Sequence, residues 1–267
     1  MSFELAPAWL FVPADRPDRY AKAAERSDIV IVDLEDAVAE GDKDAARQAL
    51  RANPLDPART VVRINARDTE HFEADLELIR SLPYTHIMVP KAESAEDPAA
   101  LSGFSVIALI ETARGAFKLA EIASACEVVG LMWGAEDLIA DLGGGSSRGP
   151  GGTYRDVAQH VRSQTLLAGR AHGKWVLDAI WTNIDDLAGL AEEAEDAVES
   201  GFAGKVSIHP KHIAVVREAY SPSGEQLDWA RQVLKLAETS NGAFSFEGKM
   251  VDAPLLKHAE HIVARAR

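Results

Sequence analysis

The sequence has one cysteine, Cys126, among 267 residues, so no disulfide can form within the chain. Cys126 stands in an Ala- and Ser-rich segment without a neighbouring histidine, which favours a structural residue over a nucleophile. No stretch approaches the ~18 uninterrupted apolar residues that would cross a bilayer. The start, MSFELAPAWLFVPADRP, has neither a basic region nor a continuous apolar one. We therefore expect no secretory signal and residence in the cytoplasm.

Positive charge is also scarce. The 28 Lys and Arg residues face 42 Asp and Glu residues, which gives a net charge of -14. Because long-range repulsion opposes docking on phosphates, we expect neither nucleic acid nor a membrane surface as a partner. The 47% hydrophobic and 26% charged residues are typical of a globular protein with a packed core.

Short runs rich in Val, Ile and Leu alternate with amphipathic, helix-forming segments along most of the chain. The eight runs, each expected to be a strand, are 9–13, 28–36, 60–65, 86–91, 105–111, 127–134, 175–180 and 205–210. Nearly continuous apolar strands are typical of a parallel sheet covered on both faces. Eight such units in residues 1–220 predict an α/β fold, a (β/α)8 TIM barrel, rather than an open sheet.

Two further helix-like segments follow the eighth unit and flank a link that contains Gly, Ser and Phe. We expect residues 221–267 to form a C-terminal helical extension that packs on the barrel or on a neighbouring subunit.

Polar residues end every predicted strand. In strand order they are Asp15 and Arg16; Asp33, Glu35 and Asp36; Arg63 and Asn65; Lys91 and Glu93; Glu111 and Thr112; Glu136 and Asp137; Asp178; and His209. For any one of these residues, a structural role as a helix cap or in an ion pair explains its position as well as a functional role does. A buried charge is costly unless it is paired. A whole ring at the carboxyl ends of the strands predicts an active site at the barrel mouth.

Two acids in this ring, Glu111 and Asp137, follow neighbouring strands. Carboxylate oxygens are the ligands that Mg²⁺ prefers, and one or two from the protein leave positions for substrate. No His or Cys set has zinc spacing. Arg63 has apolar neighbours, and its planar fork of donors suits a carboxylate. Metal and arginine together predict a small oxo-acid or hydroxy-acid as substrate.

The glycine-rich segment GGGSSRGPGG, residues 143–152, lacks the Gly-Lys-Ser/Thr ending of a phosphate-binding loop and does not follow the first strand. We interpret it as a mobile loop over the site.

Several motifs in order resemble the citrate lyase beta-subunit-like group of the HpcH/HpaI aldolase family, in its short stand-alone form related to malyl-CoA and citramalyl-CoA lyases. The matching segments are 10–17, 28–38, 61–66, 89–94, 108–115, 133–143, 207–210 and 246–260. The resemblance implies a TIM barrel that forms homo-oligomers, usually trimers or hexamers. It also implies lyase or Claisen chemistry on acyl-CoA thioesters.

The same resemblance assigns roles to residues. It implies that Glu111 and Asp137 bind Mg²⁺, that Arg63 holds the substrate carboxylate, and that an acid of the MVD segment, Asp252, is a catalytic acid or base, often supplied by an adjacent subunit. Glu35 is expected to join Arg63 and Asp252 in catalysis. The remaining residues expected to bind substrate are Arg16, Asp33, Asp36 and Lys91, together with Glu111 itself.

The leading prediction is Mg²⁺-dependent cleavage of citramalyl-CoA or malyl-CoA to acetyl-CoA and pyruvate or glyoxylate, or the reverse reaction. The sequence leaves the substrate, the direction and any later thioester hydrolysis open. One alternative is an aldolase that forms a Schiff base on Lys91. Another is a non-catalytic subunit that binds a CoA ester.

Overall fold

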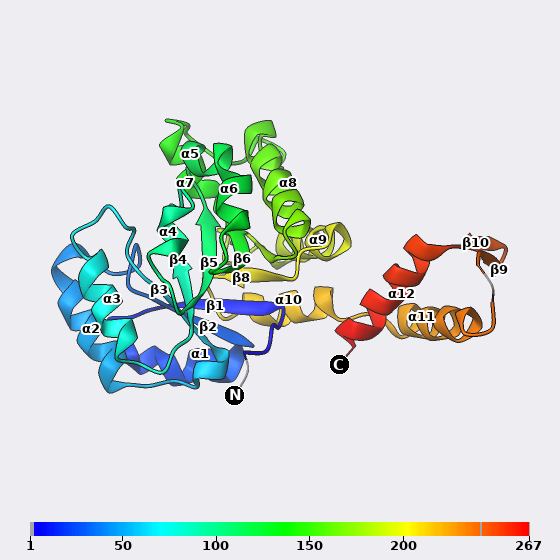
Figure 1. The fold of residues 1–267 in the computed structure, drawn as a ribbon, viewed down its shortest axis with the longest axis horizontal. Coiled ribbons are helices and arrows are strands. Elements are labelled where there is room, and N and C mark those ends of the chain that lie inside the picture. Colours follow the sequence, from blue (N-terminus) through cyan, green and yellow to red (C-terminus); the bar gives the residue numbers. More distant parts are fainter. Residues whose placement is uncertain (1–2, 241, 267) are drawn as a thin grey trace. The chain divides into compact units, whose positions relative to one another are not determined.

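The computed structural model of the protein describes residues 3–240 and 242–266. The chain divides into two compact units, Met1–Val216 and Arg217–Arg267. In the first unit eight parallel strands close into a barrel in sequence order (Figure 1). Their bounds are β1 (Ala8–Pro13), β2 (Ile29–Asp33), β3 (Thr60–Arg63), β4 (His86–Val89), β5 (Ser105–Ile110), β6 (Val128–Trp133), β7 (Trp175–Asp178) and β8 (Gly204–Ser207). The predicted (β/α)8 barrel is confirmed.

Some strands end earlier than the apolar pattern predicts. β3 ends at Arg63 and β4 at Val89, so Asn65 and Lys91 lie in loops. The reason is visible in their backbone hydrogen bonds. The N–H of Asn65 donates to the Asp75 carboxylate at 2.9 Å, and that of Lys91 donates to Glu111 at 3.0 Å, instead of to a neighbouring strand.

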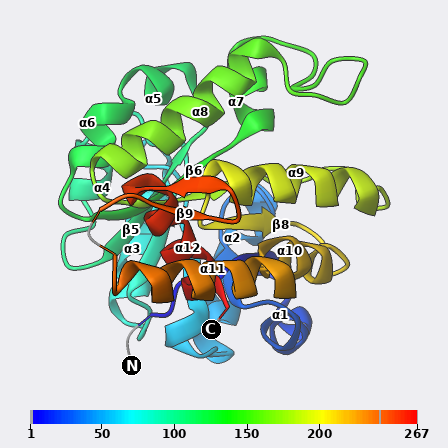
Figure 2. The same ribbon diagram turned by 90° about the vertical axis from the view of Figure 1, so that its right-hand side faces the viewer.

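Helices follow the strands and cover the outside of the barrel (Figures 1 and 2). The α-helices are α1 (Tyr20–Arg26), α2 (Lys43–Ala52), α3 (Phe72–Arg80), α4 (Glu96–Ala99), α5 (Ala113–Phe117), α6 (Leu119–Ser124), α7 (Ala135–Asp141), α8 (Asp156–Ala171), α9 (Leu187–Ser200) and α10 (His212–Tyr220). Short 3-10 helices are η1 (Pro17–Arg19), η2 (Glu40–Asp42) and η3 (Pro57–Arg59). No described helix combines the length and the apolar content that a membrane crossing requires.

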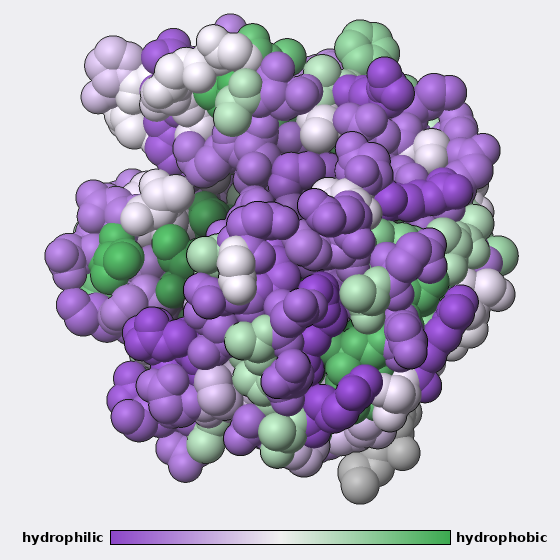
Figure 3. Space-filling view, turned by 90° about the vertical axis from the view of Figure 1, so that its left-hand side faces the viewer, coloured by the Kyte–Doolittle hydropathy of each residue, from purple (hydrophilic) through white to green (hydrophobic). Residues whose placement is uncertain are grey.

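Alternate strand residues fill the barrel interior, as the two-residue period of a strand requires. This core consists of Trp9, Ile29, Ile31, Val61, Met88, Ile107, Leu109, Met132, Leu177 and Val206. The other strand residues face the helices, so both faces of β2 are fully buried. The face drawn in Figure 3 is predominantly hydrophilic, with hydrophobic residues in separate small patches. The polar residues that follow the strands lie beyond this apolar core and are available for a site.

The second unit contains α11 (Gly224–Ala237), β9 (Phe244–Phe246), β10 (Lys249–Val251) and α12 (Ala253–Arg265). α11 begins with a capping box, in which Ser223 and Gln226 bond to each other's backbone N–H. The two strands form an antiparallel hairpin around Glu247 and Gly248, both with positive φ, as a two-residue turn requires. α11 and α12 lie side by side (Figure 2) and bury a small core that includes Val233.

Candidate active site

Glu111 and Asp137 meet at the ends of two neighbouring strands. β5 and β6 pair in register at Ile110 and Trp133, so Glu111 comes directly after β5 and Asp137 lies in the first turn of α7, just after β6. Glu111 is 2% exposed, and Asp137 is half-buried. Gly134 makes this approach possible, because a Cβ there would lie 2.7 Å from Glu111 Oε2.

The electrostatics of this pair are unfavourable without a cation. Burial, and after it the nearby Asp137 carboxylate, raise the pKa of Glu111 to about 8, although Arg63 and Lys91 act in the opposite direction. Two carboxyl groups of this kind resist simultaneous ionisation. A divalent cation between them would remove that penalty, and an all-oxygen donor set suits Mg²⁺. The pair therefore fits the predicted metal, with Glu111 and Asp137 as the residues that would hold it.

A cavity of about 670 Å³ opens in front of the pair. Lys91, Glu111 and Asp137 are predicted site residues that line it. Its outer wall carries Arg67 and Arg114, two partly exposed cations in long ion pairs with Asp97 at 3.5 Å and Glu93 at 3.6 Å. Neither arginine belongs to an apolar strand, and the sequence analysis gives neither a role, although Arg114 lies within the matching segment 108–115.

Arg63 is held by Asp33. The two residues are register partners at the ends of β3 and β2. Nε and Nη2 of Arg63 donate to the two carboxylate oxygens at 2.7 and 2.6 Å. Burial alone would lower the pKa of Arg63, but Asp33 and then Glu35 raise it above its ordinary value. Asp33 thus occupies one edge of the guanidinium, and Nη1 at its end lies 3.0 Å from Glu35 Oε2.

Glu35 lies between Arg63 and Lys91, and of these three residues only Lys91 lines the cavity. Glu35 is 5% exposed, and its Oε1 accepts a short hydrogen bond from the Lys91 ammonium. Its Oε2 is buried and accepts no hydrogen bond from the described residues. Burial raises the pKa of Glu35, with Arg63 and Lys91 opposing that shift. Asp36 lies at the edge of the cluster, with Oδ2 3.5 Å from Lys91 Nζ.

A buried lysine that the motifs do not indicate supports the loop that carries Glu35. Lys43, at the start of α2, donates from Nζ to Leu34 O, to Glu35 O and to Asn65 Oδ1, each at 2.8 Å. Asn65 in turn donates from Nδ2 to Asp75 at 2.6 Å. Lys43 has the sequence surroundings of a solvent-facing helix residue, so only its contacts reveal the role.

Other members of the predicted ring lie elsewhere. Arg16 is exposed and sits 3.8 Å from Asp18, outside the lining of the cavity. Asp178, expected at the mouth, is fully buried, where it accepts from Trp133 Nε1 at 2.8 Å and pairs with Arg162 and Lys205. Leu177 fills the barrel core, so its neighbour Asp178 faces the helices and has a structural role. Asp252 is the N-cap of α12 in the second unit.

The glycine-rich segment has more contacts than a mobile loop would need. Arg148 and Tyr154 form an isolated β-bridge, and Ser147 Oγ donates to Glu136 at 2.6 Å. The Arg148 guanidinium lies over the rings of Tyr154, at 3.7 Å, and Trp181, at 4.4 Å, and pairs with Glu193 at 2.6 Å. These contacts join the segment to α7 and α9.

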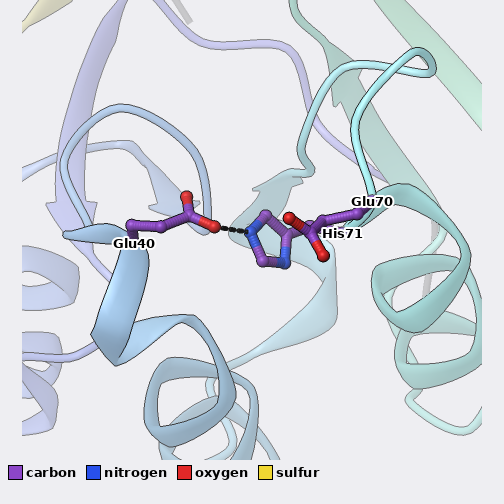
Figure 4. A group of neighbouring side chains, drawn as sticks. All are labelled: Glu40, Glu70 and His71. Atoms are coloured by element: carbon purple, nitrogen blue, oxygen red, sulfur yellow. Dashed lines mark hydrogen bonds and ion pairs between the residues drawn. The ribbon is translucent and has the colours of Figure 1, made fainter.

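A second group of possible metal ligands lies on the loops after β2 and β3 (Figure 4). Glu40, Glu70 and His71 have ligand atoms within 4.8 Å of one another. Both glutamates are exposed, and Glu40 Oε1 is already 2.6 Å from His71 Nε2. Glu40 and His71 are already paired with each other, and an exposed pair gains little from binding a cation, unlike the buried Glu111 carboxylate. We therefore interpret the group as a surface ion pair between Glu40 and His71.

A closed parallel barrel with a polar cavity at the carboxyl ends of its strands defines a TIM-barrel enzyme. The model of the HpcH/HpaI aldolase/citrate lyase family matches residues 8–210, and the chain belongs to this family. It is a carbon–carbon lyase of the citrate lyase beta-like type, as its sequence motifs predict.

The relatives agree along nearly the whole chain. The citrate lyase subunit beta-like protein of Mycobacterium tuberculosis is 59% identical over 260 residues, 97% of this chain and 95% of that protein. The crystal structure of CitE from the same organism, in complex with magnesium, acetoacetate and coenzyme A, superposes with a TM-score of 0.93, with 58% identity and 98% of each chain covered. Human mitochondrial citramalyl-CoA lyase is 31% identical over 294 residues, 97% of this chain and 85% of that protein.

Proposed function

We propose that the protein is a Mg²⁺-dependent lyase that cleaves, or forms, a hydroxyacyl-CoA thioester such as citramalyl-CoA or malyl-CoA. The products of cleavage are acetyl-CoA and a small keto-acid, pyruvate or glyoxylate. The observation that carries the proposal is the buried Glu111 beside Asp137 at the cavity. The Arg63 guanidinium is ion-paired with Glu35, which also pairs with Lys91 of the cavity lining. The related CitE structure, which binds magnesium, acetoacetate and coenzyme A, supports the proposal.

Cleavage removes the proton of the substrate hydroxyl, breaks the adjacent carbon–carbon bond and passes its electrons to the thioester as an enolate, which then takes up a proton. Magnesium bound by Glu111 and Asp137 would lower the pKa of the hydroxyl and chelate the neighbouring carboxylate. Arg63 would orient that carboxylate through the end of its guanidinium, because Asp33 occupies the other edge. Glu35, whose Oε2 is ion-paired with Arg63 Nη1 at 3.0 Å and accepts no hydrogen bond from the described residues, would accept the hydroxyl proton.

We assign the protonation of the enolate to Asp252. Its side chain stands at the N-cap of α12 but makes no capping hydrogen bond there. The protein would act as a homo-oligomer, a trimer or a hexamer, in which the Asp252 of one subunit completes the site of another.

The first test is a turnover assay. Acetyl-CoA or propionyl-CoA is mixed with pyruvate or glyoxylate, with and without Mg²⁺, and CoA esters are followed by mass spectrometry. We expect a Mg²⁺-dependent hydroxyacyl-CoA product that is lost in Glu111→Ala and kept in Glu70→Gln, a matched change of an exposed acid at the same mouth. Substrate binding without product in a folded, Mg²⁺-binding protein would contradict the enzyme assignment and favour a CoA-ester-binding subunit.

The second test addresses Asp252. Asp252→Asn and Glu111→Gln should each be inactive. If sites are shared between subunits, equal mixing and reassembly should restore about a quarter of the wild-type activity, because random assembly of a head-to-tail ring pairs two intact residues at that frequency. No recovery, together with a single-subunit mass by light scattering, would place Asp252 in the site of its own chain or outside any site.

The Schiff-base alternative requires a neutral lysine amine. Burial alone would lower the pKa of Lys91, but its hydrogen bond and ion pair with Glu35 raise that pKa above the ordinary value. A protonated, ion-paired ammonium does not attack a carbonyl. The contacts of Lys91 therefore favour a different role.

A further inference from the structure

Lys91 has an unusual backbone for a residue of its type. Its φ of 48° lies in the left-handed region, and Glu247 is the one other described non-glycine residue with positive φ. Glu247 belongs to a two-residue hairpin turn that demands this conformation. Lys91 follows Pro90 in a turn after β4, where proline at the preceding position is compatible with positive φ but a long side chain is uncommon. Backbone strain at such a position persists only when surrounding contacts impose it, and it accumulates at functional sites.

The backbone contact at Lys91 reaches a metal ligand. The next residue, Ala92, donates its N–H to Leu109 O at 3.1 Å, which continues the barrel ladder. The N–H of Lys91 instead donates to Glu111 Oε1 at 3.0 Å. This bond fixes one carboxylate oxygen of Glu111, Oε1.

The side chain of Lys91 acts on a second acid from another strand. Its ammonium donates to Glu35 Oε1, while Oε2 of Glu35 lies 3.0 Å from Arg63 Nη1. One residue of the β4 loop thus binds a single oxygen of each of two buried acids, one after β5 and one after β2. Neither the Schiff-base role nor a simple contact with substrate would require both bonds.

We propose that Lys91 is a positioning residue for both acids. Its left-handed backbone presents the N–H that fixes Glu111 Oε1, and its ammonium fixes Glu35 Oε1. This assignment rests on the proposed lyase function, but the metal-binding half does not depend on turnover. The two halves act through different atoms of Lys91, so different substitutions separate them.

Lys91→Gly and Lys91→Val test the backbone. Both remove the ammonium, but glycine adopts positive φ freely, whereas a β-branched residue does not. By titration calorimetry, Lys91→Gly should bind Mg²⁺ with an unchanged dissociation constant, and Lys91→Val should bind it roughly 10- to 100-fold more weakly, as expected when a partner of a metal ligand is lost. Equal affinities in these two variants would overturn this half, whether or not any thioester is turned over.

Lys91→Arg tests the ammonium. Relative to wild type, Lys91→Gly should lose about 10²-fold or more in kcat, the scale of a general-base contribution, with little change in KM. Lys91→Arg keeps the charge and should recover part of that kcat, which a Schiff-base lysine would not permit. A rise in KM alone, or an arginine variant as inactive as the glycine variant, would overturn this half.

Folding of each variant is checked by circular dichroism. If Lys91→Val does not fold, Lys91→Ala replaces it, since alanine also disfavours positive φ and should weaken Mg²⁺ binding relative to glycine. If no substrate pair gives product in the wild type, the proposed function fails, and the calorimetric comparison of glycine with valine or alanine still decides the backbone half.

Discussion

Asp33 and Arg63 form a buried pair in which two guanidinium nitrogens donate to two carboxylate oxygens, at 2.7 and 2.6 Å. Asp33 also accepts the backbone N–H of Glu35 at 2.9 Å and of Ala37 at 3.1 Å. A single carboxylate thus sets the direction of the arginine and the path of the loop that carries Glu35. The positions of Arg63 and Glu35 therefore depend on Asp33, although both of its carboxylate oxygens bond to protein groups and not to substrate.

Asp33→Asn should lower both stability and activity. The amide keeps the shape but loses the charge and one acceptor oxygen, and breaking one partner of a buried pair costs about 3–5 kcal/mol in the free energy of unfolding. Urea unfolding measures the loss. Asp36→Asn is the matched control, since the 3.5 Å pair of Asp36 with Lys91 is more exposed and should change stability by less than about 1 kcal/mol. Equal stability of the two variants would contradict the anchoring role of Asp33.

Mg²⁺ should raise the melting temperature through the inner acidic pair. A ligand that binds only the folded state at 100 times its dissociation constant adds about 2.7 kcal/mol of stability. Differential scanning fluorimetry should show this shift in the wild type and in Glu70→Gln, and not in Glu111→Gln. Without metal, Glu111→Gln should melt no lower than the wild type, because burial penalises the charged carboxylate. A shift that survives in Glu111→Gln but is lost in Glu70→Gln would instead locate binding at the surface group of Figure 4.

Stability at acid pH should depend on Asp178. Burial alone would raise its pKa, but Lys205 and Arg162 lower it to about 2, below its ordinary value of 3.8. A lowered pKa stabilises the fold above the ordinary value, and that contribution is lost as the pH falls towards the lowered one. The Asp178 contribution should therefore fall by roughly 1 kcal/mol between pH 5 and pH 3.

Urea unfolding at pH 5 and at pH 3 measures this change in the free energy of unfolding. The change should be smaller in Asp178→Asn than in the wild type and unaltered in Asp196→Asn, whose side chain is 61% exposed. An identical change in all three proteins would show that Asp178 titrates normally.

Arg148 should protect the glycine-rich segment, residues 143–152, from proteolysis. Arg148→Met removes the ion pair with Glu193 and the charge over Tyr154 and Trp181. Limited proteolysis should then cut residues 143–152 several-fold faster than in the wild type, because local opening costs less free energy. Arg51→Met, a change of an exposed arginine on α2, is the control. Equal cleavage rates in Arg148→Met and the wild type would return this segment to the mobile loop that its composition suggests.

The sequence by itself determined the barrel and the acidic pair. Eight apolar runs separated by helical segments leave few other folds, because consecutive parallel strands with short right-handed connections place neighbours side by side. Glu111 and Asp137 follow consecutive runs, so their proximity follows from chain order alone. The family motifs reinforce the same residues, and the family itself is confirmed.

Tertiary structure alone decided which side chains pair. The pattern places Arg63 and Asp178 at strand ends, but the register of β2 with β3 gives one edge of Arg63 to Asp33, and the two-residue period of β7 turns Asp178 outward to Lys205. The left-handed backbone of Lys91 is likewise not indicated by its residue type, since lysine does not favour positive φ. Periodicity reports which face of a strand or helix is buried. Pairing across strands depends on register and on loops that bring distant residues together, and no local pattern encodes those.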